Sequence, residues 1–328
     1  MKRPQASPAH SKLHVPSPQS DSPDTALDLS LRPFPPKPEV TVANRRLWEF
    51  WPGNNRFYLH GRLMLGPCVE IKWTLLTVVV LVGLSAAYFV FVLPYLWKDV
   101  NAGLPVANIV LFICALGSMG LCMCVEPGII PRKCVFELGG YVPEEFTTNI
   151  LVKDMERGAQ YKYCSTCQVF RPPNAHHCNT CGNCVEVFDH HCPFLNNCIG
   201  KRNYRYFLAF IASAVSVGLS EIAGLFLFLL YDPNNQTSVI DADIVKWIVV
   251  ALLIATCLVT LFVTILCCFH VDLCLSGETT KERLKHTHDP KKEKSCFRPY
   301  PSWFSPLQML TLQQVMKAET WRETEVRS

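Results

Sequence analysis

The chain has 328 residues, of which 49% are hydrophobic and only 18% are charged. This charged share is well below the roughly 25% of an ordinary soluble domain, and a formal net charge of +4 is too small to indicate a nucleic-acid partner. The 17 cysteines do not indicate a disulfide-rich secreted fold, because the chain opens on MKRPQASPAH, which lacks the apolar stretch of a signal peptide.

Residues 1–44 are rich in proline and serine, with nine prolines among the first forty residues. Such a composition cannot bury enough apolar surface to fold, so this segment is predicted to be a disordered tail. Residues 45–72 are predicted to be a juxtamembrane segment leading into the first long apolar run.

Four apolar runs are each long enough to cross a bilayer, which takes about 20 residues. They cover residues 73–96 and 104–125, within a first membrane region at 73–125, and residues 206–230 and 247–270, within a second at 206–270. Buried core helices of a soluble protein are the alternative. Three of the runs contain no Asp, Glu, Lys or Arg, which favours membrane spans. Glu221 is the one acid in the third run, and it could line a cavity, pair with a partner subunit or be protonated.

Lysine and arginine give the orientation. Of the 31 basic residues, 29 lie in the segment before the first run, the loop 126–205 and the tail after residue 270. The positive-inside rule therefore predicts that both termini and the loop 126–205 are cytosolic. The tail at 271–328 includes a weakly amphipathic stretch near 306–318, where a short helix is expected.

The loop 126–205 carries seven cysteines and four histidines between Cys164 and Cys198. Because cytosolic cysteines stay reduced, metal binding or catalysis is favoured over disulfides. Repeated C-x2-C pairs with interleaved histidines are typical of tetrahedral zinc sites. Two closed sites use eight of the eleven groups and leave three over, and a spare cysteine beside a histidine would be a nucleophile with a base. Spacing alone does not decide which cysteine is spare.

The pattern C-x2-C-x9-HC-x2-C-x2-C-x4-DHHC-x5-C resembles that of the DHHC family of protein S-acyltransferases. Thr279, Thr280 and Glu282 match the family's TTxE motif, and Glu126-Pro127-Gly128 resembles its DPG motif, with Glu in place of Asp. The stretches 47–54 and 201–206 look like the branch that contains the Ras palmitoyltransferases. The resemblance implies an all-α polytopic membrane protein, in which four transmembrane helices carry a small, loop-rich, cytosolic domain with two zinc ions.

The resemblance also implies roles for individual residues. One structural zinc ion would be held by Cys164, Cys167, His177 and Cys184, and the other by Cys178, Cys181, His191 and Cys198. Cys192 would be the nucleophile, His190 its base and Asp189 the group that orients His190, with Thr279, Thr280 and Glu282 in support. Acyl-CoA would be contacted by Phe194, where the family usually has Trp, and by Lys201, Arg202 and Arg205.

The function implied is transfer of a palmitoyl group from acyl-CoA to cysteines of membrane-associated substrate proteins. The similarity to the Ras palmitoyltransferase branch suggests an accessory subunit as a further partner. The expected location is the Golgi or endoplasmic reticulum, with the plasma membrane as an alternative. A catalytically silent, zinc-bearing membrane scaffold is the alternative function. A zinc-ribbon nucleic-acid binder is disfavoured because the loop lacks a strong basic excess. A channel is disfavoured because the four runs hold one central charge.

Overall fold

The computed structural model describes residues 42–135, 161–231, 242–285 and 309–311, together with residues 314 and 317. The chain divides into two compact units, Met1–Glu39 and Val40–Ser328, and all described residues belong to the second. The tail predicted at 1–44 therefore lies almost entirely outside the described residues.

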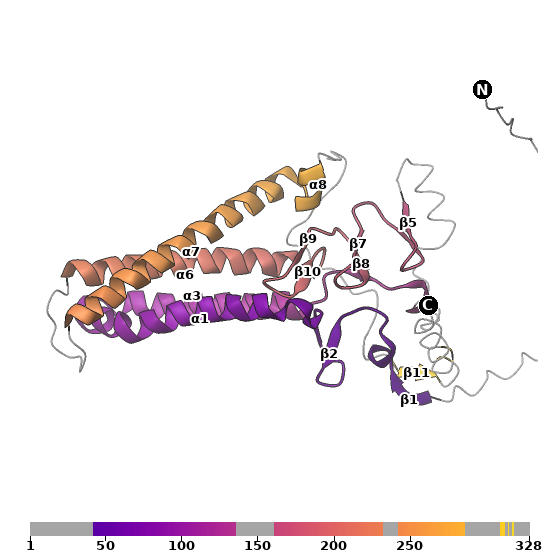
Figure 1. Ribbon diagram of the computed structural model, residues 1–328, viewed down its shortest axis with the longest axis horizontal. Coiled ribbons are helices and arrows are strands. Elements are labelled where there is room, and N and C mark those ends of the chain that lie inside the picture. The colour runs from indigo at the N-terminus through magenta and orange to yellow at the C-terminus, as the bar shows by residue number, and fades with distance from the viewer. Residues whose placement is uncertain are drawn as a thin grey trace, which may run out of the picture. The chain divides into compact units, whose positions relative to one another are not determined.

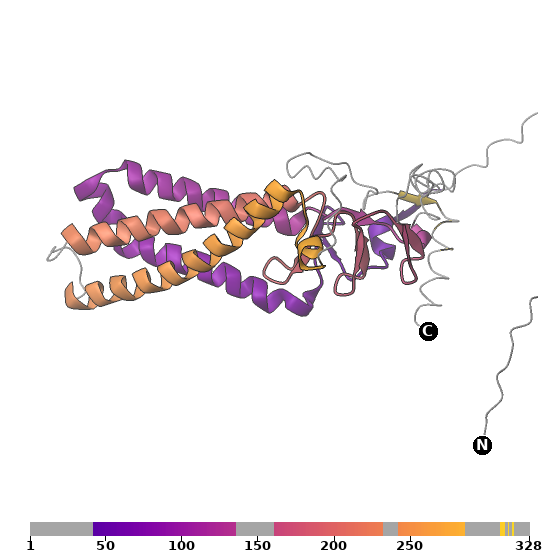
Figure 2. The same ribbon diagram turned by 90° about the horizontal axis from the view of Figure 1, so that it is seen from above.

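Four long helices lie side by side (Figures 1 and 2). Each is long and apolar enough to cross a membrane, so the four predicted spans are confirmed at this level. The helix α6 packs against both α3 and α7, and α1 also contacts α7. Many of their large apolar side chains face outward, as lipid contact requires. The bounds are α1 (Ile71–Phe91), α3 (Gly103–Cys124), α6 (Tyr204–Tyr231) and α7 (Ala242–Ser276).

The link between α1 and α3 is also helical. It consists of the short α2 (Leu93–Tyr95) and a π-helical turn η3 (Leu96–Val100). Pro94 lies in the first turn of α2, where a residue without an N–H costs no hydrogen bond.

The cysteine-rich region is built from short antiparallel strands, so the expectation of an all-α protein is too narrow. Strand β4 (Ile129–Ile130) pairs with β8 (Asn183–Val185), which pairs with β7 (His176–Cys178). Two further hairpins join β5 (Lys162–Cys164) to β6 (Val169–Arg171), and β9 (His190–Cys192) to β10 (Asn197–Ile199). These strands have two or three residues each and include metal ligands, so they carry little strand propensity of their own. The sequence pattern therefore did not predict them.

The residues before α1 form small elements that pack on this region. They are β1 (Val42–Arg46), the 3-10 turn η1 (Leu47–Phe50), the hairpin β2 (Arg56–Tyr58) and β3 (Leu63–Leu65), and a second 3-10 turn η2 (Cys68–Glu70). Strand β1 pairs with β11 (Met309–Thr311) from the tail. Within the stretch 306–318, where a helix is expected, residues 309–311 form a strand and residues 314 and 317 are helical, while the other positions lie outside the described residues.

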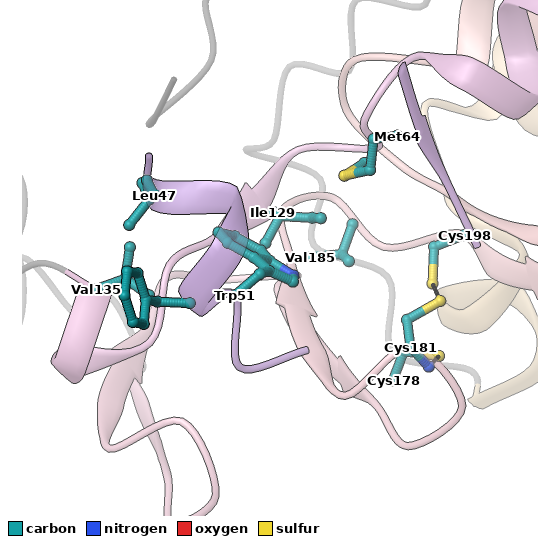
Figure 3. Packing of buried hydrophobic residues seen from close by; sticks show 10 residues of the cluster. Leu47, Trp51, Met64, Ile129, Val135, Cys178, Cys181, Val185 and Cys198 are labelled. Atoms are coloured by element: carbon teal, nitrogen blue, oxygen red, sulfur yellow. Dashed lines mark hydrogen bonds between the residues drawn. The ribbon is translucent and has the colours of Figure 1, made fainter. Parts of the chain in front are cut away.

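Figure 3 shows the apolar cluster under these elements, where Leu47, Trp51 and Val135 lie on one side and Cys178, Cys181 and Cys198 on the other. Their side chains pack in one cluster with Met64, Ile129 and Val185. Cysteines make up three of its ten members, so the sulfur atoms of this cluster also fill the core of the small domain.

Helix α8 (Thr280–Lys285) follows α7 after a turn at Gly277, whose φ of 69° is in the left-handed region that favours glycine. The turn returns the chain toward β9, and this brings Thr280 to Asp189.

Candidate active site and metal sites

The first metal-ligand cluster comes from two hairpins. Cys164 and Cys167 flank the turn of β5–β6, and His177 of β7 pairs directly with Cys184 of β8. His177 Nδ1 lies 3.7, 3.3 and 3.7 Å from the sulfur atoms of Cys164, Cys167 and Cys184, respectively. The four ligand atoms lie within 4.8 Å of one another, so the cluster can hold a metal ion.

The second cluster repeats this arrangement one hairpin further along the chain. Cys178 and Cys181 flank the turn after β7, and His191 of β9 pairs with Cys198 of β10. His191 Nδ1 lies 3.5, 3.4 and 3.5 Å from the sulfur atoms of Cys178, Cys181 and Cys198. The sulfur atoms of Cys181 and Cys198 are 3.4 Å apart.

Both clusters fit a closed tetrahedral zinc site. Zinc bonds of 2.0–2.1 Å to nitrogen and 2.3 Å to sulfur place neighbouring ligand atoms about 3.5–3.8 Å apart, close to the separations of 3.3–3.7 Å observed from His177. Each cluster already provides four ligand atoms. Neither therefore leaves the open position that a catalytic zinc ion needs.

The two clusters are related by a constant offset of 14 residues, which sequence reasoning missed. Adding 14 to 164, 167, 177 and 184 gives 178, 181, 191 and 198, which are the ligand positions of the second cluster. The signal is present in the printed sequence, because HHC occurs at 176–178 and again at 190–192.

Asp189, His190 and Cys192 come together at β9. His190 donates from Nδ1 to Asp189 Oδ2 over 2.8 Å, and the Asp189 side chain is only 1% exposed. Burial lowers the pKa of His190, but its hydrogen bonds to Asp189 and Cys192 outweigh that effect and raise the pKa to about 9. The imidazole beside the Cys192 thiol is therefore held in its charged form at neutral pH, and a neighbouring cation favours a thiolate.

His176 provides an internal comparison, because it occupies the equivalent position 14 residues earlier. It follows Ala175 instead of an acid, and its ring packs edge-on against Phe188 with centroids 6.0 Å apart. Burial, followed by the nearby charges of Lys281 and Arg171, lowers the pKa of His176 to about 4. The two histidines differ because His190 lies beside Asp189 and Cys192, whereas His176 lies near cations.

The TTxE residues hold Asp189 from the other side. Thr280 donates to Asp189 from its backbone N–H over 2.9 Å and from its hydroxyl over 2.6 Å. Glu282 accepts from the backbone N–H and the hydroxyl of Thr279, both at 2.8 Å, and donates from its own N–H to Thr279 Oγ1 over 3.2 Å. This capping box starts α8 and thereby fixes the backbone of Thr280.

A cavity of about 420 Å³ reaches Cys192 and runs between α1, α6 and α7. Its walls are almost entirely apolar, with Cys192 and Phe194 among the lining residues. Glu221 also lines it and accepts a hydrogen bond of 2.6 Å from the Ser85 hydroxyl. Of the three readings left open for Glu221, the described residues support the cavity-lining position.

Comparison with known proteins identifies the family. Residues 158–287 match the family described as DHHC palmitoyltransferase. Mouse palmitoyltransferase ZDHHC18 is 31% identical over 263 residues, which cover 76% of this chain and 67% of the mouse protein. The chain belongs to the DHHC palmitoyltransferase family. Human palmitoyltransferase ZDHHC14 is 33% identical over 283 residues, or 81% of this chain, and zebrafish ZDHHC18-A is 36% identical over 281 residues, or 78%. This chain spans 56% of the length of each of these two relatives.

Glu126 stands where the DHHC resemblance leads one to expect Asp. Its carboxylate accepts the backbone N–H groups of Gly128 and Ile129, both at 2.7 Å, and forms an ion pair with Arg202. The longer acid therefore still closes the turn into β4, so the substitution preserves the local structure.

The three basic residues assigned to acyl-CoA all have protein partners. Lys201 pairs with Glu186 at 3.2 Å, Arg202 pairs with Glu126, and the Arg205 guanidinium lies over the Tyr206 ring at 4.5 Å from its centroid. Their role toward a phosphate stays a prediction, since each would have to share or exchange a partner that it already has.

Sequence reasoning did not predict that His270 and Tyr204 belong to the candidate site. His270 of α7 is 2% exposed, and it forms a compact group with Asp189 and His190, with donor and acceptor atoms within 4.8 Å of one another. Its Nδ1 lies 3.0 Å from the hydroxyl of Tyr204, which also receives a sulfur–oxygen contact of 3.8 Å from Cys274. A histidine inside an apolar run was the available signal, although only the fold places it beside β9.

Proposed function

We propose that this DHHC family member is an integral-membrane protein S-acyltransferase, which moves a palmitoyl group from acyl-CoA to cysteines of substrate proteins through an acyl-Cys192 intermediate. The observation that carries the proposal is the placement of Cys192. It lies close enough to His190 to raise the pKa of that imidazole, His190 donates to Asp189, and Cys192 lines the apolar cavity.

The reaction follows from this arrangement in two transfers. The Cys192 thiolate attacks the carbonyl carbon of the acyl-CoA thioester, the carbon–sulfur bond to CoA breaks, and the CoA thiolate leaves with a proton supplied by His190. A substrate cysteine, deprotonated in turn by His190, then attacks acyl-Cys192, the carbon–sulfur bond to Cys192 breaks, and the Cys192 thiolate leaves beside the protonated His190. Asp189 keeps His190 in one tautomer and orientation through both steps.

Two zinc ions are assigned a structural role. Cys164, Cys167, His177 and Cys184 would hold one, and Cys178, Cys181, His191 and Cys198 the other. When bound, zinc supplies fixed crosslinks to a small region with little apolar core, and this rigidity keeps β9 and its nucleophile in place.

The cavity accounts for the acyl donor. An alkyl chain among α1, α6 and α7 stays out of water, which is worth roughly 0.8 kcal/mol for each methylene group. Phe194 lines the cavity near Cys192 and lies against Trp73, with ring centroids 6.2 Å apart. It would contact the first carbons of the acyl chain. Lys201, Arg202 and Arg205 are assigned to the phosphates of CoA, which remain in the aqueous phase.

The same proposal includes the membrane setting. The distribution of basic residues supports a cytosolic location for both termini and the zinc-bearing region, and the proposed substrates are cysteine-bearing proteins at the same membrane surface. The Golgi or endoplasmic reticulum is the assigned compartment, with the plasma membrane as the alternative. Membership of the Ras palmitoyltransferase branch, and an accessory subunit with it, belong to the proposal as well.

The test is incubation of the purified full chain with labelled palmitoyl-CoA. Hydroxylamine-sensitive label on the wild type, absent from Cys192→Ser with unchanged zinc content, supports the proposal. If a folded wild type with two zinc ions takes up no label, either alone or after co-expression with accessory subunits of Ras palmitoyltransferases, the scaffold function replaces it.

A further inference from the structure

The start of α1 and the residue before it contact the chain on both sides of Cys192. On the N-terminal side, the carboxylate of Glu70 accepts a hydrogen bond of 2.7 Å from His191 Nε2. On the C-terminal side, the hydroxyl of Thr74 donates to the carbonyl of Pro193 over 3.1 Å. Residues 70 and 191 are 121 positions apart in the sequence, so only the fold brings them together.

The Glu70 contact fixes the tautomer of His191. The Nδ1 atom of His191 faces three sulfur atoms at 3.4–3.5 Å, so this nitrogen is the one available to a metal ion. The proton of the neutral ring must then be on Nε2, which donates to Glu70. A carboxylate behind a ligand histidine orients the ring and strengthens the metal bond.

Glu70 does not cap the N-terminus of α1 with its side chain, although it is the N-cap residue of that helix. At this position, short Ser, Thr, Asp and Asn side chains usually accept a hydrogen bond from the helix backbone. Its side chain makes no capping hydrogen bond, and it is directed to His191 instead. A capping role therefore leaves this carboxylate unexplained.

The Thr74 contact is buried and local to the nucleophile. Thr74 is 4% exposed, and Pro193 is the residue directly after Cys192. The carbonyl of Pro193 also accepts the N–H of Asn196, which closes the turn between β9 and β10. Thr74 therefore ties this turn to α1.

The helix that makes both contacts is also a wall of the cavity. One face of α1 carries residues at spacings of three and four positions, in register with Glu70 just before the helix. These residues are Thr74, Thr77, Leu81 and Ser85, and the last three line the cavity that reaches Cys192. A single rigid helix thus connects one metal cluster, the nucleophile segment and the cavity wall.

We infer that Glu70 and Thr74 are positioning residues for acyl transfer. They act on Cys192 through its neighbours His191 and Pro193, and so hold its sulfur against the cavity. This inference rests on the proposed function. A displacement of about 1 Å at a reacting atom can lower a rate about 100-fold, so a contact on each side of the nucleophile has a direct kinetic use.

The experiment compares Glu70→Ala, Glu70→Gln, Thr74→Val and Thr74→Ser in the full-length protein, purified in detergent. Asp99→Ala is the matched control, because Asp99 is a carboxylate in the link between α1 and α3, outside the candidate site. Two quantities are measured on each protein. The first is the rate at which a chromogenic chelator removes each equivalent of zinc, and the second is the rate of acyl-Cys192 formation as a function of palmitoyl-CoA concentration.

The two positions should give different results. In Glu70→Ala, one zinc equivalent of two is expected to leave about 10–100-fold faster, while the other leaves as in the wild type. Glu70→Gln keeps an acceptor oxygen and should release zinc more slowly than Glu70→Ala. In Thr74→Val, zinc release should be unchanged, but the maximal acylation rate should fall about tenfold or more at an unchanged KM. Thr74→Ser, which retains the hydroxyl, should restore it.

The inference is overturned if Glu70→Ala releases zinc as Asp99→Ala does, or if both equivalents leave faster, because that would indicate general loosening. It is also overturned if Thr74→Val acylates at the wild-type rate. A wild type that binds two zinc ions but forms no acyl-Cys192 refutes the proposed function. In that case, faster release of one equivalent in Glu70→Ala still supports the contact with His191.

Discussion

The hydroxyl of Thr280 lies 2.6 Å from Oδ2 of Asp189, the same carboxylate oxygen that accepts the proton of His190. A residue after the last membrane helix therefore orients the acid of the candidate active site. Replacing Thr280 by Val removes this hydrogen bond at nearly constant volume. A hydrogen bond to a charged group contributes about 1.5–3 kcal/mol, so acyl-Cys192 formation should slow about tenfold or more.

Thr280→Ser is the control for that prediction, since it keeps the hydroxyl and should restore most of the rate. The zinc content should stay at two in both variants, because Thr280 contacts neither cluster. An unchanged acylation rate in Thr280→Val would show that the backbone N–H of residue 280 is sufficient to hold Asp189.

The pH dependence of Cys192 reactivity should depend on Asp189. In the wild type, the pKa of His190 is raised to about 9, so the imidazolium that favours the thiolate persists through neutral pH and is lost as pH rises through about 9. Asp189→Asn removes the negative charge and so lowers the pKa of His190 from about 9. Alkylation of Cys192 by iodoacetamide at pH 7 should therefore be slower in Asp189→Asn than in the wild type.

The measurement is the rate of Cys192 alkylation between pH 5 and pH 10, followed by mass spectrometry of the peptide that contains it. Asp99→Asn serves as the control and should reproduce the wild-type profile. Identical profiles for Asp189→Asn and the wild type would refute the assigned role of Asp189.

Metal removal should unfold the hairpins and leave the membrane helices intact. The ligand sulfurs belong to the core of the small domain, so loss of the metal–sulfur bonds that crosslink the hairpins disrupts it. After exhaustive chelation, the far-UV circular dichroism of the helices should persist, while trypsin should gain access to Lys162 and Arg171. Added zinc should restore resistance to trypsin. Undiminished resistance in metal-free protein would contradict the structural role of the metal.

Gly66 and Gly83 form a matched pair for a test of packing. A Cβ atom on Gly66 would overlap the backbone carbonyl of Asn196, whereas a Cβ on Gly83 meets nothing within 4 Å. Gly66→Ala should therefore destabilise the protein by about 1–3 kcal/mol. Gly83→Ala, within α1, should be neutral or stabilising by up to about 1 kcal/mol. Thermal unfolding in detergent, monitored for each variant, distinguishes the two, and equal melting temperatures would contradict the close approach at Gly66.

The parts of this protein that sequence reasoning could predict are those with a local signal. The helices are set by apolar length, because a bilayer requires about 20 apolar residues in a row. The count of cysteines and histidines predicts two metal clusters with groups left over, and the resemblance to the DHHC family assigns the individual ligands and the roles of Asp189, His190 and Cys192. The structure brings each of these sets together.

The parts that could not be predicted are contacts between distant segments. Glu70 meets His191, Thr74 meets Pro193, and His270 joins Asp189, and none of these pairs shares a pattern along the chain. The short strands were missed for another reason. Their pairing is imposed by tight turns between ligands, so residues such as Asn183 and Cys184 form strands without strand propensity.

The 14-residue offset between the two clusters also relates Cys192 to the metal ligands. Counting on by 14 once more from Cys178 and Cys181, which open the second cluster, gives Cys192 and Leu195. Cys192 thus occupies the position equivalent to the first ligand of each cluster, whereas Leu195, at the second position, cannot bind a metal. Cys192 therefore lacks the second cysteine of a C-x2-C pair, and its thiol stays outside both metal clusters.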